Sequence, residues 1–493
     1  MNNSYSKLEK NMYLIGVLGQ SMIYEIIGTG FSYYLQSVIF IPAIIIGLLT
    51  TITKILDALK NPIMGSIVDR TKTKWGKCRP YLLFTPSIIC ILTMFCFFNG
   101  TYNSNNNFSL NFYIVFFATF IYLMWGIVFT ATDVPLWSLI SLITEDENDR
   151  SNLMISARNI SNIGCGIVAF SIVYISQILG KVITERINDN TKGLKYGVII
   201  IAISLTLVSS IMFQMAGLFT KERIKTNHCK KKNLKENILV MWNCKPFKQL
   251  LISGLLRSPV SLMRKIQLTL LTYYYGDNGN TPYIHIFILL GGGYMIAQFV
   301  AIAITPHITK KISKDIFFYK TNVYSIVPYL SLFAVYAVAH DKLDKGIWFI
   351  LVFIIFILIG ASAGFINALQ SLMIADIVDY EEYKNGYRPD GVFYSLQPFL
   401  SNFSNGIASL LSGIIFSIVG FSGDGVRLIN DALYDGASFK SDSVFSLCRL
   451  SMFVMCSILP AIGLAISLIP LKKYNLSDSK HKLIMEKLKK TRN

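Results

Sequence analysis

The stretch Trp348-Phe-Ile-Leu-Val-Phe-Ile-Ile-Phe-Ile-Leu-Ile-Gly-Ala-Ser-Ala-Gly-Phe365 contains no charged side chain. Its length is close to the ~20 residues that an α-helix needs to cross the ~30 Å hydrocarbon layer of a membrane. Inside lipid, a helix satisfies its own backbone hydrogen bonds without help from water. The stretch therefore predicts a transmembrane helix.

Comparable apolar runs recur along the whole chain. The plainest of the others are Met12–Tyr34, Val38–Leu56, Tyr81–Phe98, Phe112–Ile143 and Tyr196–Leu218. The 493 residues are 53% hydrophobic and 15% charged, whereas soluble proteins carry ~25% charged residues. A single soluble core could not bury this much apolar sequence, because such cores stop growing well below this length. We predict an all-α membrane protein with about twelve transmembrane helices.

The predicted spans form two sets of six, separated by a basic segment. We place them at residues 11–34, 38–68, 80–99, 110–143, 151–180, 195–219, 248–275, 282–308, 318–339, 347–380, 391–419 and 443–471. The corresponding domains are a first six-helix bundle at 1–219, a cytoplasmic basic linker at 220–247, a second bundle at 248–471 and a basic cytoplasmic tail at 472–493.

Weak internal similarity supports a duplication. The fourth span ends in the acidic cluster Glu145-Asp146-Glu147 with Arg150 shortly after, and the tenth ends in an acidic cluster from Asp376 to Glu382 with Arg388 shortly after. Paired six-helix halves around a cavity at the membrane midplane are the major facilitator architecture.

The formal charge of +18 is distributed as expected for a membrane protein. Basic residues gather in alternate loops, for example between Arg70 and Arg79 and between Lys221 and Lys248, which is the positive-inside pattern. We therefore place both termini in the cytoplasm and the chain in the cell membrane, and we exclude nucleic acid as a partner. The first apolar stretch is too long for the core of a cleavable signal peptide.

Charged side chains inside the spans are the strongest functional signal. Ionisable groups in the membrane are costly and usually face a cavity. Five of those in the first half of the chain carry the functional argument together: Glu25, Asp57, Lys60, Asp133 and Arg158. Serine and threonine in the polar stripes of these spans are better explained by hydrogen-bonded helix packing, but five charges are too costly for packing alone.

The sequence gives no sign of an enzyme. The eight cysteines are scattered without a CxxC or Cys/His cluster, so we expect neither a metal site nor redox chemistry. The Gly360-Ala-Ser362-Ala-Gly364 segment fits the hydrolase pattern, but that pattern requires a preceding strand. Here it lies in an apolar helix, where small residues allow close helix packing. We predict no catalytic residues and no cofactor.

Three long motifs resemble the glycoside–pentoside–hexuronide:cation symporter family, whose best-known member is the melibiose permease. The first runs from Asp57 through Gly65, Asp69-Arg70 and Trp75-Gly76 to Arg79-Pro80. The second is Trp125-Gly126 followed by Thr130-Ala-Thr-Asp133-Val-Pro-Leu-Trp137. The third runs from Ala375-Asp376 to Tyr394-Ser-Leu-Gln397. The motifs occur in the family's order and span both halves of the chain.

The resemblance implies a sugar site on the first, fourth and fifth spans. Asp133 and Trp137 match the family's sugar-binding aspartate and tryptophan, and Arg158 matches its fifth-helix arginine. A carboxylate accepts hydroxyl hydrogen bonds, and an indole face packs on the C–H face of a sugar. The family's first-helix lysine and aspartate correspond to Gln20 and Ser21.

Further residues complete the predicted substrate site. Glu25 lies one turn beyond Ser21 and can replace the missing carboxylate. The family's eleventh-helix lysine is Asn402 here, on the span whose polar stripe includes Gln397. These departures leave the identity of the sugar open.

The resemblance also implies a cation site, from which this sequence departs. Asp57 and Thr130 remain, but the second carboxylate is Asn61 and the intervening asparagine is Lys60. An ammonium three residues from Asp57 can pair with it where the ion would bind. We therefore predict coupling to protons, or a uniporter, rather than coupling to sodium. The alternative is that Lys60 extends away and sodium still binds.

The same motifs imply a cytoplasmic gate. Gly65, Asp69 and Arg70 form the general major facilitator gating motif, and Asp376 and Asp379 lie at a matching position in the second half. Alternating access needs a contact that can open and close. Equally, these charges can simply mark the membrane surface.

We predict a monomeric secondary transporter of a sugar or glycoside, with the lipid bilayer as its only other partner. A carrier of a lysolipid or a modified acid is the alternative, and a membrane sensor ranks last because no output domain is visible. The residues from Ser479 to Arg492 form either a basic amphipathic helix on anionic lipid or a disordered tail.

Overall fold

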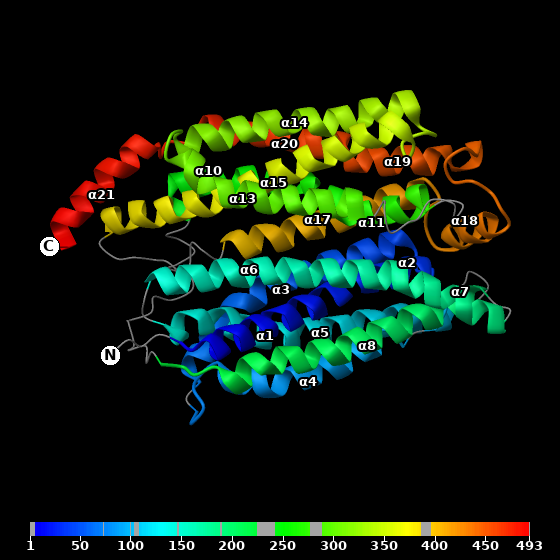
Figure 1. Cartoon of the computed structure of the whole chain (residues 1–493), viewed down its shortest axis with the longest axis horizontal. Coiled ribbons are helices and arrows are strands. Elements are labelled where there is room, and N and C mark those ends of the chain that lie inside the picture. Colours follow the sequence, from blue (N-terminus) through cyan, green and yellow to red (C-terminus); the bar gives the residue numbers. More distant parts are fainter. Residues whose placement is uncertain are drawn as a thin grey trace. The chain divides into compact units, whose positions relative to one another are not determined.

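The computed structural model describes residues 5–71, 73–98, 100–102, 108–144, 147–187, 190–223, 242–276, 288–385 and 396–492. Throughout these residues the regular structure is helical (Figure 1). The chain divides into two compact units. Unit 1 comprises Met1–His228 and Gly420–Asp431, and unit 2 comprises Cys229–Val419 and Ala432–Asn493.

The helices of unit 1 follow one another closely along the chain. They are α1 (Lys7–Glu25), η1 (Ile26–Phe31), α2 (Ser32–Ser37), α3 (Ala43–Arg70), α4 (Arg79–Cys96), α5 (Phe108–Ile143), α6 (Glu147–Phe170), η2 (Ser171–Ile175), α7 (Ser176–Ile187) and α8 (Asn190–Phe219). Most of α18 (Asp424–Tyr434) also belongs to this unit. Within unit 1, α1 packs between α8 and α6, α3 packs on α5, and α4 packs on α5 and α8.

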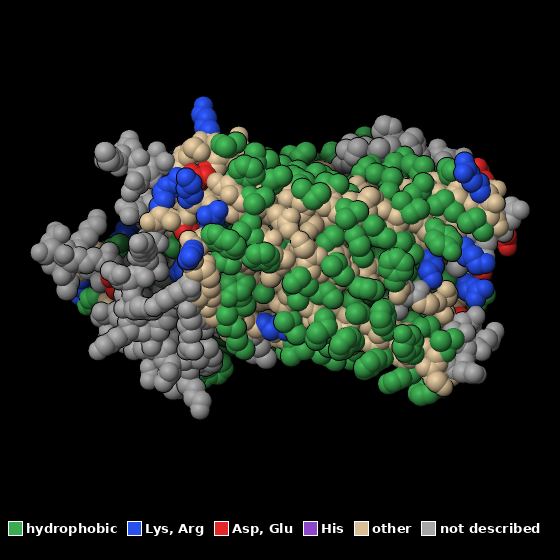
Figure 2. Space-filling model, turned by 90° about the horizontal axis from the view of Figure 1, so that it is seen from below, with side chains coloured by type: hydrophobic (Ala, Val, Ile, Leu, Met, Phe, Trp, Pro, Cys, Tyr) green, Lys and Arg blue, Asp and Glu red, His purple; other side chains and the backbone are tan. Residues whose placement is uncertain are grey.

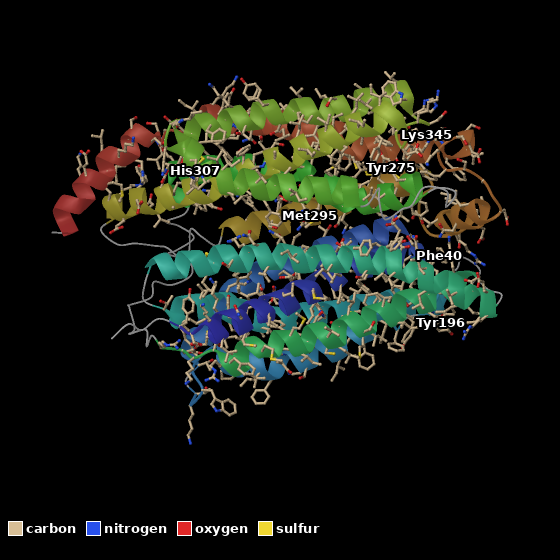
Figure 3. The ribbon with its side chains drawn as sticks, in the orientation of Figure 1. Phe40, Tyr196, Tyr275, Met295, His307 and Lys345 are labelled. Atoms are coloured by element: carbon tan, nitrogen blue, oxygen red, sulfur yellow. The ribbon has the colours of Figure 1, made fainter. Side chains whose placement is uncertain are left out.

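Unit 2 contains the remaining helices. They are α10 (Lys245–Leu256), η3 (Ser258–Val260), α11 (Ser261–Leu270), η4 (Leu271–Tyr275), η5 (Ile288–Gly292), α13 (Gly293–Thr309), α14 (Lys314–Ala339), α15 (Gly346–Asn385), α17 (Leu396–Ile418), η6 (Ser443–Phe445), α19 (Ser446–Cys456), α20 (Ile458–Lys472) and α21 (Asp478–Arg492). In this unit α15 packs on α13 and α14, and α20 packs on α10 and α14. His307 and Lys345 lie toward opposite ends of the unit (Figure 3).

The prediction of an all-α membrane protein is confirmed. Eight helical segments among the described residues are long and apolar enough to cross a membrane. Within the described residues, each of the twelve predicted spans overlaps helix, in some cases interrupted by a short π or 3₁₀ segment. On the face shown in Figure 2, hydrophobic side chains cover the middle, and most of the visible lysines and arginines gather toward the two ends.

Two short π-helical segments interrupt unit 1 where α1 and α6 would otherwise continue. They are η1 (Ile26–Phe31) and η2 (Ser171–Ile175). A Cβ atom on Gly30 would lie 2.4 Å from Ile172 Cδ1, so the two segments pack closely. Ser21, Glu25 and Ser32 have the spacing of one face of a regular α-helix, but the wider π turn rotates the residues that follow Glu25 away from that face. Such π segments occur frequently at functional sites.

Glycines allow α1 to lie against α8 at backbone contact distance. A Cβ atom on Gly19 would lie 2.4 Å from the Ser209 carbonyl oxygen and 2.7 Å from the Phe213 nitrogen. A Cβ on Gly16 would lie 2.4 Å from Ala216 Cβ. Because helices in lipid associate through van der Waals packing, small residues at the contact permit this approach.

We expect Gly19→Ala to destabilise the protein by about 1–3 kcal/mol, because the added methyl meets backbone atoms that cannot rotate away. Thermal unfolding of the purified protein in detergent, followed by tryptophan fluorescence, would measure the effect. Gly28→Ala is the matched control, since nothing lies within 4 Å of a Cβ at that position. Equal unfolding temperatures for the two variants would contradict the packing argument.

Two carboxylates organise one end of unit 1. Glu222 accepts hydrogen bonds from the backbone N–H groups of Lys77, Cys78 and Arg79 at 2.9, 2.8 and 3.1 Å, which satisfies free donors at the start of α4. Position 76 requires glycine for two reasons. The Glu222 carboxylate lies within 2.6 Å of the place that a Cβ atom of residue 76 would take, and the φ of +108° at Gly76 is one that residues with a side chain rarely adopt.

The second carboxylate is Glu9 on α1. It forms a capping box with Ser6 and binds Arg223 with an Nη2–Oε2 distance of 2.6 Å. This ion pair joins the start of α1 to the segment that follows α8.

A segment from the second half of the chain completes unit 1. Ser422 Oγ accepts a hydrogen bond of 2.7 Å from the backbone N–H of Ala43, a free donor at the start of α3. Phe421 is fully buried, and Gly423 lies close to the carbonyl oxygen of Phe40, in the short connection between α2 and α3 (Figure 3). We call residues Gly420–Asp431 the strap.

Candidate functional site

Asp133 on α5 is the centre of a polar cluster in unit 1. Its Oδ1 atom accepts two hydrogen bonds, from Gln20 Nε2 at 2.8 Å and from Trp137 Nε1 at 3.0 Å. Both bonds converge on the same oxygen, so the Oδ2 atom takes no hydrogen bond from the described residues. Asp133 is half-buried. The cluster therefore contains a fixed carboxylate with one oxygen available to a ligand.

Trp137 and Arg158 form the aromatic and cationic part of the cluster. Asp133 and Trp137 lie one turn apart on α5, which allows the indole N–H to reach the carboxylate. The Arg158 guanidinium on α6 lies over the indole ring, 5.9 Å from its centroid, and is exposed. Among the described residues Arg158 has no carboxylate partner within ion-pair distance. A stacked guanidinium of this kind offers its N–H groups to an incoming oxygen.

Ser21 is buried beside Gln20 and contributes to helix packing. Its Oγ atom lies 2.7 Å from Ser161 Oγ on α6 and 2.7 Å from the carbonyl oxygen of Val17. The side chain is 1% exposed, whereas Gln20 beside it reaches Asp133. Glu25, at the end of α1, is half-buried and accepts a hydrogen bond from Thr29 Oγ1.

The arrangement suits a polyhydroxylated ligand. A carboxylate oxygen accepts hydroxyl hydrogen bonds, a guanidinium donates them, and an indole supplies an apolar face. The structure brings together four of the predicted substrate residues, Gln20, Asp133, Trp137 and Arg158. Ser21 contacts this group through Gln20, with an Oγ–Oε1 distance of 3.2 Å. Sites of this kind combine an aromatic surface with a few polar groups that fix orientation.

The predicted cation site contains two ammonium groups instead of one. Asp57 Oδ1 lies 3.2 Å from Lys60 Nζ, and Asp57 Oδ2 lies 3.7 Å from Lys54 Nζ. The three side chains are only 10% to 20% exposed. A Cβ on Gly126 would lie 3.1 Å from Asp57 Oδ1 and 3.3 Å from Lys60 Nζ, which places the pair against α5. Each carboxylate oxygen is thus matched by its own lysine.

Lys54 is the functional candidate that sequence reasoning missed. Its ammonium lies 3.4 Å from the Tyr24 hydroxyl and 4.9 Å from the centre of the same ring. The i, i+3 spacing of Lys54 and Asp57 was the available signal, since it repeats the spacing of Asp57 and Lys60. Thr130, one turn from Gly126, is buried, and its hydroxyl donates to the Gly126 carbonyl oxygen at 2.9 Å.

Several predicted site residues lie elsewhere or outside the described side chains. Asn402 is half-buried on α17 of unit 2. The remaining ones belong to helices whose side chains at those positions are outside the described residues: Asn61, Gly65, Asp69 and Arg70 on α3, and Gln397 on α17. Their predicted roles in binding, coupling and gating stay predictions.

The other predicted gating residues have partners within unit 2. Lys314 Nζ, at the start of α14, lies 2.6 Å from both carboxylate oxygens of Asp376 on α15. His481 on α21 lies 3.1 Å from Asp379 and 3.6 Å from Asp376. Lys314 also binds Asp478, at the first turn of α21, through its backbone N–H at 3.0 Å.

The tail therefore forms a helix, and its docking site is the acidic end of α15. Ile484 of α21 is buried, and Lys487 lies 5.5 Å from the centre of the Tyr383 ring. Tyr474 lies in the connection to α21, and burial among the neighbouring carboxylates raises the pKa of its hydroxyl well above the ordinary value. The tail helix and the acidic end of α15 form one network of alternating charges.

Solved structures with the same fold are membrane transporters. A bacterial homologue of the human lysosomal transporter Spinster, in an inward-facing and unoccupied conformation, matches with a TM-score of 0.63 at 13% identity and covers 95% of this chain and 98% of its own. A point mutant of the nucleoside transporter NupG matches with a TM-score of 0.62 at 13% identity, over 94% of this chain and all of its own. At these identities the likeness concerns the fold.

Sequence comparison identifies the family within this class. The model of the MFS/sugar transport protein family matches residues 12–478, and the chain belongs to this family. The chain is 24% identical to the isoprimeverose transporter of Lactiplantibacillus pentosus, over 84% of this chain and 80% of the relative. It is 24% identical to the inner membrane symporter YicJ of Escherichia coli (strain K12), over 97% and 94%. It is 25% identical to the lactose permease of Lactobacillus delbrueckii subsp. bulgaricus, over 97% and 71%.

These matches confirm the resemblance and the prediction of a multi-pass membrane transporter rather than an enzyme. The family assignment rests on nearly the whole chain, so it covers the residues of both units. Which solute this chain carries is a separate question, because each relative's name describes that relative.

Proposed function

We propose that this protein carries a sugar or glycoside across the cell membrane by alternating access, with both termini in the cytoplasm. The observation that carries the proposal is the cluster of Asp133, Trp137, Gln20 and Arg158 in unit 1. The isoprimeverose and lactose transporters among its relatives support a carbohydrate as the solute. We propose that it functions as a monomer.

We propose further that sodium does not drive transport. Sodium requires several oxygen ligands and compensating negative charge, as hard cations do in general. Lys54 and Lys60 occupy both oxygens of Asp57 and give the three residues a net positive charge. Protons moving through Glu25, Asp57 or Asp133, or no coupling ion at all, are the remaining possibilities.

The test is uptake into proteoliposomes that contain the purified, full-length protein. Labelled glycosides, pentoses and hexuronates would be offered under an imposed proton gradient and, separately, under a sodium gradient at constant pH and membrane potential. We expect concentrative uptake of a sugar with protons alone, or equilibrating uptake without any ion.

The outcomes separate the two parts of the proposal. Sodium-stimulated uptake at constant pH would overturn the coupling assignment and leave sugar transport intact. Absence of uptake across the panel, with correctly folded protein, would overturn the sugar assignment and favour a lysolipid or another solute.

A further inference from the structure

The strap supplies a helix cap that α3 does not make for itself. The residue before α3 is Pro42, whose side chain has no acceptor for the free N–H groups of the first turn. Ser422 Oγ accepts a hydrogen bond from the Ala43 N–H at 2.7 Å instead, although the two residues are 379 positions apart in the chain. The start of α3 is therefore held by its contact with the strap.

The turn beneath the strap, residues 38–42, has a strained backbone. Phe40 has a φ of +64°, which is rare for a residue with a bulky side chain. Its side chain is buried, and its carbonyl oxygen would lie 3.5 Å from a Cβ atom on Gly423 of the strap. Phe421, the strap residue next to Ser422, is fully buried. Because strain of this kind persists only where the surrounding structure holds it, we expect the strap to help to hold the turn.

One residue separates the strap contact from a fixed point of unit 2. Val419 belongs to unit 2, and its carbonyl oxygen accepts a hydrogen bond from Cys448 Sγ of α19 at 3.5 Å. Only Gly420 lies between Val419 and the buried Phe421. Two residues of fully extended chain span at most ~7 Å. The strap therefore cannot follow unit 1 through a larger movement while Val419 stays bound in unit 2.

The connection from the strap back to α19 is also anchored in unit 2. Arg449 of α19 is buried, and its Nη1 atom donates to the carbonyl oxygens of Phe439 at 2.6 Å and Asp442 at 3.0 Å. The Phe439 ring is fully buried and stacks on Phe445, with 5.4 Å between the ring centres. Both connections of the strap are thus tied to unit 2, whereas Ser422 and Gly423 contact unit 1.

A glycine on each side of the strap helix α18 allows the backbone to reorient. Gly420 has a φ of +76° and Gly436 a φ of +97°, and both values favour glycine. Nothing lies within 4 Å of a Cβ atom at either position, so neither glycine is confined by a neighbour. Hinges are commonly a few connecting residues that absorb large changes in φ and ψ. The chain therefore contains the pivots that detachment of the strap requires.

We propose that the strap is a latch that detaches from the α2–α3 turn once in each transport cycle. This inference rests on the alternating access proposed above, in which the two units move against each other, but not on the identity of the solute. With both termini in the cytoplasm, the turn lies on the outer side of the membrane, because residues Lys7–Ser37 form one span. The attached strap caps α3, and its detachment lets the outer ends of the units separate.

The test is a reversible disulfide between Ala43→Cys and Ser422→Cys in the full-length protein, reconstituted in proteoliposomes. Oxidation should lower sugar uptake by about tenfold or more, because a carrier held in one conformation cannot complete its cycle. A reducing agent should restore uptake. Each single variant, treated with the same oxidant, should keep the rate of its reduced form, which controls for the native cysteines.

A second measurement does not depend on any substrate. Hydrogen exchange of the backbone amides in residues 38–47, followed by mass spectrometry, reports how often the strap opens from the turn. If the strap detaches, exchange in this peptide should slow by about tenfold or more when the disulfide forms, since local opening controls exchange. The reduced form of the same variant is the matched control.

The outcomes decide the proposal. Undiminished uptake by fully cross-linked protein would overturn it, as would hydrogen exchange that the cross-link leaves unchanged. A disulfide that does not form in folded protein, as judged by thermal unfolding, would contradict the contact itself. If neither the wild type nor the reduced variant carries any sugar, the proposed function fails, and the exchange measurement alone decides whether the strap is a latch.

Discussion

Asp133→Asn is expected to lower kcat/KM for sugar uptake by about ten- to a hundredfold. The asparagine keeps the shape and one acceptor oxygen, so Gln20 and Trp137 remain satisfied. It loses the negative charge that strengthens hydrogen bonds to sugar hydroxyls. Hydrogen bonds to charged groups contribute ~1.5–3 kcal/mol each. Since 1.4 kcal/mol corresponds to a factor of about ten, the loss of one such bond accounts for the expected drop in kcat/KM. Initial rates of uptake into proteoliposomes, measured over a range of sugar concentrations, would give the ratio.

Two variants make this result interpretable. Trp137→Phe retains an aromatic face but loses the N–H group that reaches Asp133 at 3.0 Å, so a smaller loss of about tenfold is expected. Glu185→Gln removes an exposed carboxylate on α7 and should transport like the wild type. An Asp133→Asn protein with wild-type kcat/KM would place the substrate elsewhere.

Sodium dependence is expected to appear only when both lysines beside Asp57 are removed. Lys60→Asn together with Asn61→Asp introduces the residue types that the family resemblance implies for a sodium site at those positions. Lys54 would still pair with Asp57 at 3.7 Å, so this double variant should remain insensitive to sodium. Adding Lys54→Met removes the second ammonium, which leaves Asp57 and Thr130 together with the carboxylate introduced at residue 61. Uptake at constant pH and membrane potential, with sodium replaced by choline, measures the response.

The double variant is the matched control for the triple variant, because the two differ only at residue 54. Stimulation of both by sodium would show that Lys54 does not block the site. Stimulation of neither would show that the loss of sodium coupling has a cause outside these three positions. Correct folding of each variant would be checked by its thermal unfolding in detergent.

The spans could be predicted from the sequence because hydropathy is a local property. A run such as Trp348–Phe365 must be helical in lipid whatever its neighbours are. The resemblance named Asp133 and Trp137 together, and their one-turn spacing on a single helix is what allows them to meet. Both conclusions depend on residues that are close in sequence.

Features that depend on tertiary contacts could not be predicted in this way. The π segments after Glu25 and after Phe170 change which side chains share a face, and hydropathy carries no signal for them. The buried position of Ser21 depends on Ser161 of another helix. The role of Glu222 depends on backbone donors far away in the sequence, at residues 77–79.

The tail shows the same limitation. Its composition allowed either an amphipathic helix or disorder, and neither alternative included a docking site. His481 and Asp478 find their partners on α14 and α15, more than a hundred residues earlier. A single sequence without homologues contains no information about such pairs.

The strap has a consequence for experiments that divide the gene. A plasmid encoding residues 1–228 would produce the first bundle without the segment whose Ser422 hydroxyl accepts from the start of α3 and whose Phe421 is fully buried. That fragment would lack part of its own fold when made alone. Co-expression with a second plasmid encoding residues 229–493 would supply the missing piece in trans, so the yield of the amino-terminal fragment should depend on its carboxy-terminal companion.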